Sequence, residues 1–77
     1  SNGEYEVIEA EIIETSELIS KEIKNTNLPD EIRIGAVLRD KKVIIPRSDF
    51  VFQKNDSVVF IAKNDSIPTV ENIFRLS

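Results

Sequence analysis

The sequence contains no cysteine, histidine, methionine or tryptophan, and these absences limit the chemistry that the chain can support. Without cysteine there is neither a disulfide nor a thiolate nucleophile, which is compatible with a reducing compartment. Without histidine there is no imidazole base, and the commonest zinc ligands are missing. Only carboxylates and lysines remain as candidate acids and bases, so the composition argues against an enzyme and against a metal site.

Glycine is also scarce, because Gly35 is the only glycine besides Gly3. A pyrophosphate or triphosphate is usually held by a glycine-rich loop, so a Rossmann nucleotide-binding unit is not expected in this fragment. We expect Gly35 to lie where another element crosses a strand closely. Residues 1–3, Ser-Asn-Gly, resemble the scar of a cleaved expression tag, which suggests that residues 4–77 come from a larger protein.

Long apolar runs and basic clusters are missing as well. No run approaches the roughly 20 apolar residues of a membrane span, and there is no signal-peptide pattern. The net charge is −4, and the ten lysines and arginines are spread along the chain. We therefore expect no membrane insertion and no nucleic-acid partner, since both anionic membranes and nucleic acids favour concentrated positive charge.

The length of 77 residues predicts one small domain. At this size the hydrophobic core supplies only a few kcal/mol beyond the entropy of ordering the chain. A homodimer, or a covering domain from a longer parent chain, is expected on these energetic grounds.

The pattern of apolar residues predicts an α+β fold with the order β-α-β-β-β-α, a mainly antiparallel sheet and two short helices. The alternation in residues 4–14, interrupted by glutamates, is typical of an edge strand. Thr15 or Ser16 is expected to cap a first helix ending near Asn25. A second helix is expected after Asp65 or Ser66, with Pro68 in its first turn.

The sequence pattern of residues 32–45 predicts a hairpin. Residues 32–39 alternate cleanly, Asp40 and Lys41 favour a tight turn with a solvated tip, and residues 43–45 run back. Residues 50–52 are expected to be briefly extended. Residues 57–62 are apolar on both faces, which predicts a central strand covered on both sides.

Two groups of side chains are candidates for chemistry. Glu9 and Glu11 share one strand face, a spacing that suits a paired acid and base or a hard cation, although a solvated edge is the simpler interpretation. Arg39, Arg47 and Arg33 lie near strand ends or turns, where arginine can hold a phosphate bidentately. The alternative is that these arginines pair with the many acidic residues of the surface.

Several short motifs in a fixed order resemble a known family. They are residues 16–21, Leu28-Pro29, residues 34–39 (IGAVLR), Ile45-Pro46, Asn55-Asp56 before an apolar strand, and residues 67–74 (IPTVENIF). Their order and spacing are similar to those of the TrkA C-terminal domain family, also called RCK-C. The resemblance extends over nearly all of residues 8–77, and residues 4–77 are identified as one such domain.

The resemblance implies a cytoplasmic regulatory module that dimerises and lies at the inner face of the membrane through a potassium channel or transporter. It implies no cofactor in this fragment, with NAD or ATP in an upstream Rossmann-type domain of the parent. Some relatives bind cyclic dinucleotides at the dimer interface, so the alternative function is a sensor of a nucleotide-type anion for another transporter. Arg39, Pro46 and Arg47 are the candidate ligand-binding residues.

The chain departs from the family pattern at three places. Ser20 stands where the family often has glycine before the helix lysine, and on a helix this change is expected to be harmless. Asn55 replaces the glycine before Asp56, and asparagine also tolerates left-handed dihedrals. Asp40 or Lys41 stands in place of the hairpin glycine.

Overall fold

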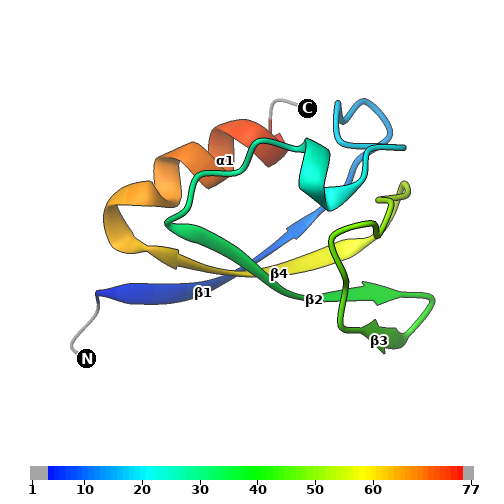
Figure 1. The fold of residues 1–77 in the computed structure, drawn as a ribbon, viewed down its shortest axis with the longest axis horizontal. Helices are drawn as coiled ribbons and strands as arrows, with labels where there is room; N and C mark the ends of the chain where they lie inside the picture. The colour runs from blue at the N-terminus through cyan, green and yellow to red at the C-terminus, as the bar shows by residue number, and fades with distance from the viewer. Residues whose placement is uncertain (1–3, 76–77) are drawn as a thin grey trace.

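Four antiparallel strands form one sheet in the order β1-β4-β2-β3 (Figure 1). In this computed structural model, which describes residues 4–75, the strands are β1 (Tyr5–Glu11), β2 (Ile32–Arg39), β3 (Lys42–Ile44) and β4 (Ser57–Lys63). The predicted α+β class, the edge position of β1 and the central position of β4 are confirmed.

The helical elements lie on one side of this sheet. They are the α-helix α1 (Ile67–Arg75) and the 3-10 helices η1 (Ile23–Asn25) and η2 (Asn64–Ser66). Figure 1 places α1 and the loops that carry η1 over the same face. Pro68 lies in the first turn of α1, as predicted. No helix within residues 4–75 is long and apolar enough to cross a membrane.

The hairpin between β2 and β3 has a two-residue turn. Arg39 pairs with Lys42 across it. Asp40 and Lys41 both have positive φ, at 52° and 67°. This is the type I′ geometry that suits the right-handed twist of the strands, so the predicted turn is confirmed.

Alternation along the strands divides the sheet into two faces. The inner face points toward α1, and its most buried members are each at most 3% exposed: Ile32, Val37, Val58, Phe60 and Ala62. Val70 and Phe74 of α1 cover it, and the Phe60 and Phe74 rings meet edge to face with centroids 4.5 Å apart. The hydrophobic core lies between this face, α1 and the loops.

The helix predicted for residues 15–25 is wrong, because turns and the short η1 occupy this segment. Ser20 has φ 70°, which stops a right-handed helix. The Ser20 N–H donates to the Phe52 carbonyl at 3.0 Å, and the Ile23 N–H to the Phe50 carbonyl at 3.0 Å. The backbone therefore pairs with residues 50–52, which are extended as predicted, rather than with its own preceding turn.

The apolar residues of that segment are still buried, although turns and not a helix carry them. Leu18 is 5% exposed and Ile19 packs against the core. The Ser16 hydroxyl accepts a hydrogen bond from the Leu18 N–H at 3.0 Å, so it caps a turn instead of a helix. A helix of about ten residues is marginal without strong packing, which is why tertiary hydrogen bonds override it here.

Gly35 lies at an irregularity of the β2 and β4 pairing, between Ile34 and Ala36. A Cβ added at this position would meet only the Val59 carbonyl oxygen, at an ordinary 3.7 Å. The predicted close crossing is therefore wrong, and the glycine marks a bulge instead. Residues 1–3, interpreted above as a tag scar, lie outside the described residues.

Candidate functional site

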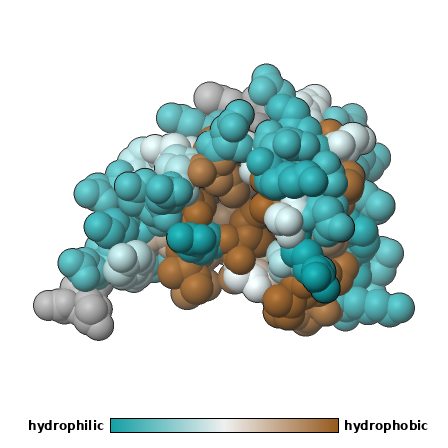
Figure 2. All heavy atoms as spheres, viewed as in Figure 1, coloured by the Kyte–Doolittle hydropathy of each residue, from teal (hydrophilic) through white to brown (hydrophobic). Residues whose placement is uncertain are grey.

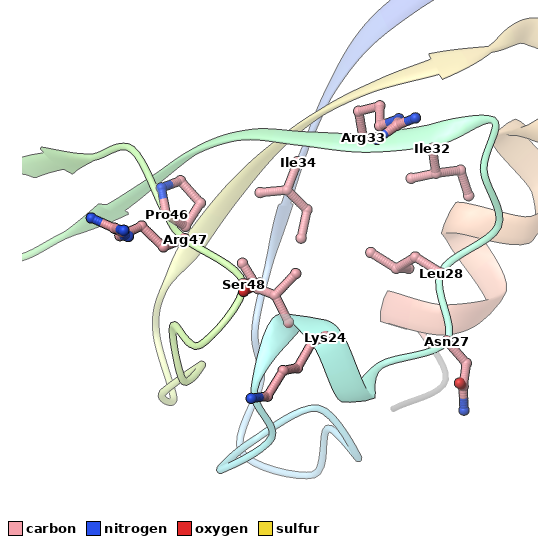
Figure 3. A pocket seen from close by; sticks show the side chains of 10 residues that line it. Lys24, Asn27, Leu28, Ile32, Arg33, Ile34, Pro46, Arg47 and Ser48 are labelled. Carbon is pink, nitrogen blue, oxygen red and sulfur yellow. The ribbon is translucent and has the colours of Figure 1, made fainter.

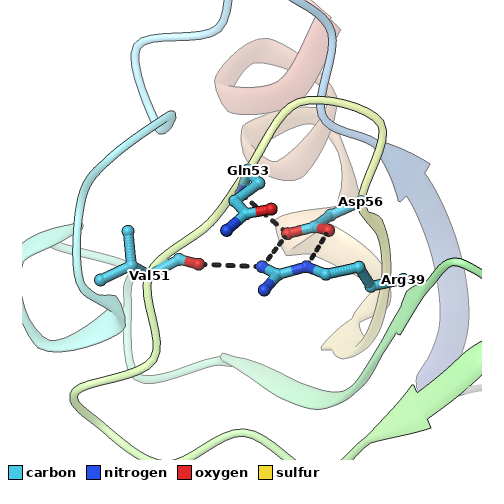
Figure 4. Close-up of polar contacts among 4 residues, drawn as sticks. All are labelled: Arg39, Val51, Gln53 and Asp56. Carbon is cyan, nitrogen blue, oxygen red and sulfur yellow. Dashed lines mark hydrogen bonds and ion pairs between the residues drawn. The ribbon is translucent and has the colours of Figure 1, made fainter.

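Arg39, at the end of β2, is held in a network of hydrogen bonds (Figure 4). Its Nε and Nη2 donate to the two carboxylate oxygens of Asp56, each at 2.8 Å, and Nη2 also donates to the Val51 carbonyl at 3.0 Å. The guanidinium lies 4.8 Å from the centre of the Phe50 ring. The hydrogen bond to Asp56 is the main cause that raises the pKa of Arg39.

Asp56 completes this network from just before β4. Its side chain is 1% exposed, and it also accepts the Gln53 N–H at 2.8 Å. A buried carboxylate is stable only when it is paired and hydrogen-bonded, and Asp56 meets both conditions. Arg39 therefore fastens the loop of residues 50–56 to the end of β2, and its donors are largely used inside the protein.

Pro46 and Arg47 lie apart from this network, at a cavity of about 410 Å³. Its walls come from η1, the start of β2 and the corner after β3, and its lining residues are Ile23, Lys24, Asn27, Leu28, Ile32, Arg33, Ile34, Pro46, Arg47 and Ser48. Arg39 does not line it. The structure thus brings together two of the three predicted ligand-binding residues, together with Arg33.

The interior of this cavity is apolar and its charges lie at the edge. Figure 3 shows Ile32, Ile34 and Leu28 pointing inward, whereas the charged ends of Lys24 and Arg47 point away from the centre of the cavity. Arg33 alternates with Ile32 and Ile34 along β2, so its side chain leaves on the other side of the sheet. Lys24 was not among the residues predicted from the sequence. The predicted helix gave no sign that its N–H donates to the Ser48 carbonyl, next to Arg47 in the chain.

Glu9 and Glu11 both lie exposed on β1, at the edge of the sheet. The Ser57 hydroxyl donates a hydrogen bond to Glu9. No cluster of three potential metal-ligating side chains occurs within residues 4–75. These observations favour the solvated edge over a carboxylate or cation site.

The second face of the sheet, here called the outer face, is open. Its apolar members are Tyr5, Val7, Ala36, Leu38, Val43, Val59 and Ile61, which are neighbours through the strand register. Val7 is 71% exposed, Val43 66% and Ile61 44%. The prediction that residues 57–62 are covered on both sides is therefore wrong for a single chain. The alternation of Tyr5 and Val7 with inward residues was the signal for this surface.

Charged residues flank the apolar part of the outer face at opposite ends. Lys63 lies at the end where β1 begins, and Glu9 and Glu11 lie at the other end. The row of Val7, Ile61 and Arg33 lies between these ends. This face therefore combines exposed apolar area with a separation of charge along the strand direction.

The chain is similar to proteins of potassium transport. A family model described as the TrkA-C domain matches residues 7–75. Over 76 residues the chain is 42% identical to the Trk system potassium uptake protein TrkA of Azorhizobium caulinodans, covering 99% of this chain and 17% of that relative. The chain thus spans a small part of the length of the relative that it matches.

Two solved structures share the fold. One is the RCK_C domain dimer of S. agalactiae BusR in complex with c-di-AMP, with a TM-score of 0.78, 24% identity and coverage of 92% of this chain and 97% of that chain. The other is the RCK C domain of the potassium transport protein KtrA in complex with c-di-AMP, with a TM-score of 0.77, 21% identity and coverage of 90% and 82%. A longer BusR chain, of which this chain covers 36%, was solved with its busAB-promotor DNA.

Proposed function

Because this chain belongs to the TrkA-C domain family, we propose that it is the regulatory and dimerisation domain of a TrkA-type protein that controls potassium transport through a membrane channel or transporter. The domain acts without catalysis, in the cytoplasm, at the inner face of the membrane through its partner. NAD or ATP binding belongs to a Rossmann-type domain of the parent protein, and no cofactor is held here.

The outer face is the observation that carries the dimer part of this proposal. A small domain gains little stability from one core, and an open apolar sheet face offers a second layer when another copy covers it. The charge separation favours one arrangement of two copies. A two-fold axis in the interface, perpendicular to the strands, brings the basic end of one copy over the acidic end of the other.

Sedimentation of an Ile61→Lys variant tests this interface. Ile61 is 44% exposed near the centre of the outer face, and Ile13, 41% exposed outside the strands, provides a matched control as Ile13→Lys. We expect Ile61→Lys to weaken dimerisation by roughly 30-fold or more, as at a central interface residue, and Ile13→Lys to leave it unchanged. A stable wild-type monomer at high concentration, or equal effects of the two variants, would contradict the proposal.

The second candidate function is a sensor of a nucleotide-type anion at the dimer interface. The solved BusR and KtrA domains hold c-di-AMP, which motivates this alternative. Of the candidate ligand-binding residues Arg39, Pro46 and Arg47, Arg47 is the arginine whose side chain has no hydrogen-bond partner within residues 4–75, since Arg39 is bound to Asp56. Calorimetric titration with c-di-AMP and adenine nucleotides tests it, with Arg47→Gln expected to weaken any binding and Lys54→Gln as a distant control. No heat with any of these nucleotides would rule it out.

The expected absence of a nucleic-acid partner stays a prediction. The BusR relative was solved with DNA, but most of that longer chain lies outside the region that this chain matches. The net charge of −4 and the scattered basic residues support the expectation for this domain alone. A filter-binding assay at low salt would check it, and retention of DNA by the domain would overturn it.

A further inference from the structure

The strand β1 leaves one edge of the sheet uncovered. It stands at the end of the strand order and pairs only with β4, so no strand within residues 4–75 lies along its other side. Just before β1, the Glu4 carbonyl accepts a hydrogen bond from the Asn64 N–H at 3.0 Å. Just after β1, the Ile12 N–H donates to the Asp56 carbonyl at 2.8 Å. The even-numbered positions of this segment therefore direct their backbone groups toward β4.

The odd-numbered positions of β1 direct their backbone groups to the open edge. In an antiparallel strand the N–H and C=O of one residue point to the same side, and those of the next residue point to the opposite side. Val7, Glu9 and Glu11 therefore present N–H donors and C=O acceptors along this edge. Such an edge can accept another extended chain as an additional strand.

A groove beside this edge offers room for the side chains of an added strand. It has a volume of about 350 Å³ and lies between β1 and α1. Ile8 and Ala10 line it from β1, and Val70 and Phe74 line it from α1. Ile13, which is 41% exposed, adds to its apolar lining. Because alternate side chains of a strand point to the same face of a sheet, every second side chain of an added strand faces this groove.

The charge of this groove is opposite to that of the cavity beside Pro46. Figure 2 shows hydrophobic side chains around a hollow near the middle of the molecule, over the region of β2, where that cavity lies. Three cations and no carboxylate line that cavity. The groove at β1 is lined by three glutamates and no cation, namely Glu9, Glu11 and Glu71. Charge complementarity therefore favours a cationic partner at the groove.

The same charges argue against a second copy of β1 at this edge. Pairing of two β1 strands would place glutamates of one copy along glutamates of the other, and like charges on neighbouring strands destabilise the pair. A strand with lysine or arginine at alternate positions meets the opposite condition. Its basic side chains lie beside Glu9 and Glu11 on the outer face, and its remaining side chains face the apolar groove.

We propose that the open edge of β1 and the groove beside it bind an extended segment of a partner protein in which apolar and basic residues alternate. The backbone of the segment pairs with Val7, Glu9 and Glu11. Its apolar side chains enter the groove between β1 and α1, and its basic side chains lie beside the glutamates. The site is complete within one chain, so binding does not require dimerisation through the outer face.

Amide NMR titrations of the whole chain with three acetylated and amidated peptides test the proposal. Each peptide has the length of β1, seven residues. The first alternates lysine with valine, the second alternates glutamate with valine, and the third carries the lysines and valines of the first in two separate blocks. We expect the first peptide to bind roughly tenfold tighter than the other two, because it alone combines positive charge with alternation. Equal affinity for all three would overturn the proposal.

Hydrogen exchange shows whether the lysine–valine peptide adds a strand at the edge. Its binding should slow exchange roughly tenfold at the N–H groups of Val7, Glu9 and Glu11. Exchange at Ile8 and Ala10 should change much less, because their N–H groups already face β4. Slowing that does not alternate along β1 would exclude pairing at this edge.

Variants of the edge separate its backbone from its charge. Glu9→Pro removes both the carboxylate and the edge N–H, whereas Glu9→Gln removes the carboxylate alone, and proline is tolerated on an edge strand where the N–H faces solvent. We expect Glu9→Pro to weaken binding of the lysine–valine peptide roughly tenfold, and Glu9→Gln and Glu71→Gln about threefold each. Asp40→Asn removes the same charge on the exposed hairpin at the other side of the sheet and should have no effect. Equal losses in all four variants would mean that net charge alone attracts the peptide, contrary to the proposal.

Two isoleucine variants keep failure of this site distinct from failure of the dimer. Ile13 lines the groove, and Ile61 lies on the outer face. Ile13→Lys should weaken binding of the lysine–valine peptide roughly tenfold and leave dimerisation unchanged in sedimentation, and Ile61→Lys should do the reverse. The proposal fails if the wild-type chain does not bind this peptide, or if both variants lose peptide binding equally.

Discussion

The two faces of the sheet are built from the same strands but have opposite environments. In β4, Phe60 is 0% exposed and its neighbour Ile61 is 44% exposed. Both are large and apolar, so residue type alone does not decide their burial. What decides it is the cover, because α1 and the loops pack on one face and nothing within residues 4–75 packs on the other.

The comparison separates two ways in which apolar area stabilises this protein. The inner face stabilises the single chain. The buried Asp56, which is paired with Arg39, adds to this stability. The outer face adds stability only when a partner covers it. Substitutions on the inner face should therefore lower the free energy of unfolding at every protein concentration. Substitutions on the outer face should change the affinity of the two copies for each other.

The largest effect is expected from Phe60→Ala on the inner face. Phe60 is fully buried and contacts the Phe74 ring, so its removal leaves a cavity and should lower the free energy of unfolding by about 3–5 kcal/mol. Ile61→Ala, one residue further along β4, should cost the monomer less than about 1 kcal/mol. Urea denaturation at low protein concentration measures both. Similar losses would show that the two faces do not differ as described.

Asp56→Ala is expected to have the next largest effect. It leaves the Gln53 N–H and the Arg39 guanidinium without their acceptor. Because the Arg39 side chain is 25% exposed and regains some water, we expect a loss of about 2–3 kcal/mol, below the full cost of an unpaired buried charge. Urea denaturation measures it.

The control for Asp56 is Glu14→Ala. Glu14 and Lys54 form an ion pair at 3.7 Å, with side chains 75% and 55% exposed. Its removal should change the free energy of unfolding by less than about 0.5 kcal/mol. An Asp56→Ala loss as small as this would mean that the Arg39 network does not hold the loop of residues 50–56.

A charge exchange on the outer face tests the two-fold arrangement of the dimer. About an axis through the row of Val7 and Ile61, Lys63 of one copy approaches Glu9 of the other. Lys63→Glu should therefore weaken dimerisation about fivefold, and Lys63→Glu combined with Glu9→Lys should restore it. Sedimentation equilibrium at low salt measures both variants. A double variant no better than the single one would exclude this axis.

The elements that depend on local pattern could be predicted from the sequence. Alternation placed the strands, and the preference of Asp40 for turns placed the hairpin. The conformation of residues 16–25, which cover part of the inner face, could not be predicted. The backbone of this segment pairs with residues 50–52, which are far along the chain. The same segment bonds to the corner after β3 through the Lys24 N–H and the Ser48 carbonyl, so the place of Lys24 at the candidate cavity could not be predicted from the sequence.

Ser20→Gly should have the smallest effect on the free energy of unfolding. The sign of this effect shows whether residue 20 lies in a helix or in a turn over the inner face. Ser20 has φ 70°, a region that costs an L-residue roughly 1–2 kcal/mol and costs glycine almost nothing. After the extra entropy of unfolded glycine is subtracted, we expect a gain of about 0.5 kcal/mol, which raises Tm by about 2–4 °C. Asn27→Gly, at φ 57°, is the control and should be near neutral, because asparagine already tolerates this region. Thermal unfolding followed by circular dichroism measures both variants. In a helix the same glycine would lower stability by about 0.5–1 kcal/mol, so a destabilised Ser20→Gly variant would contradict the observed turn.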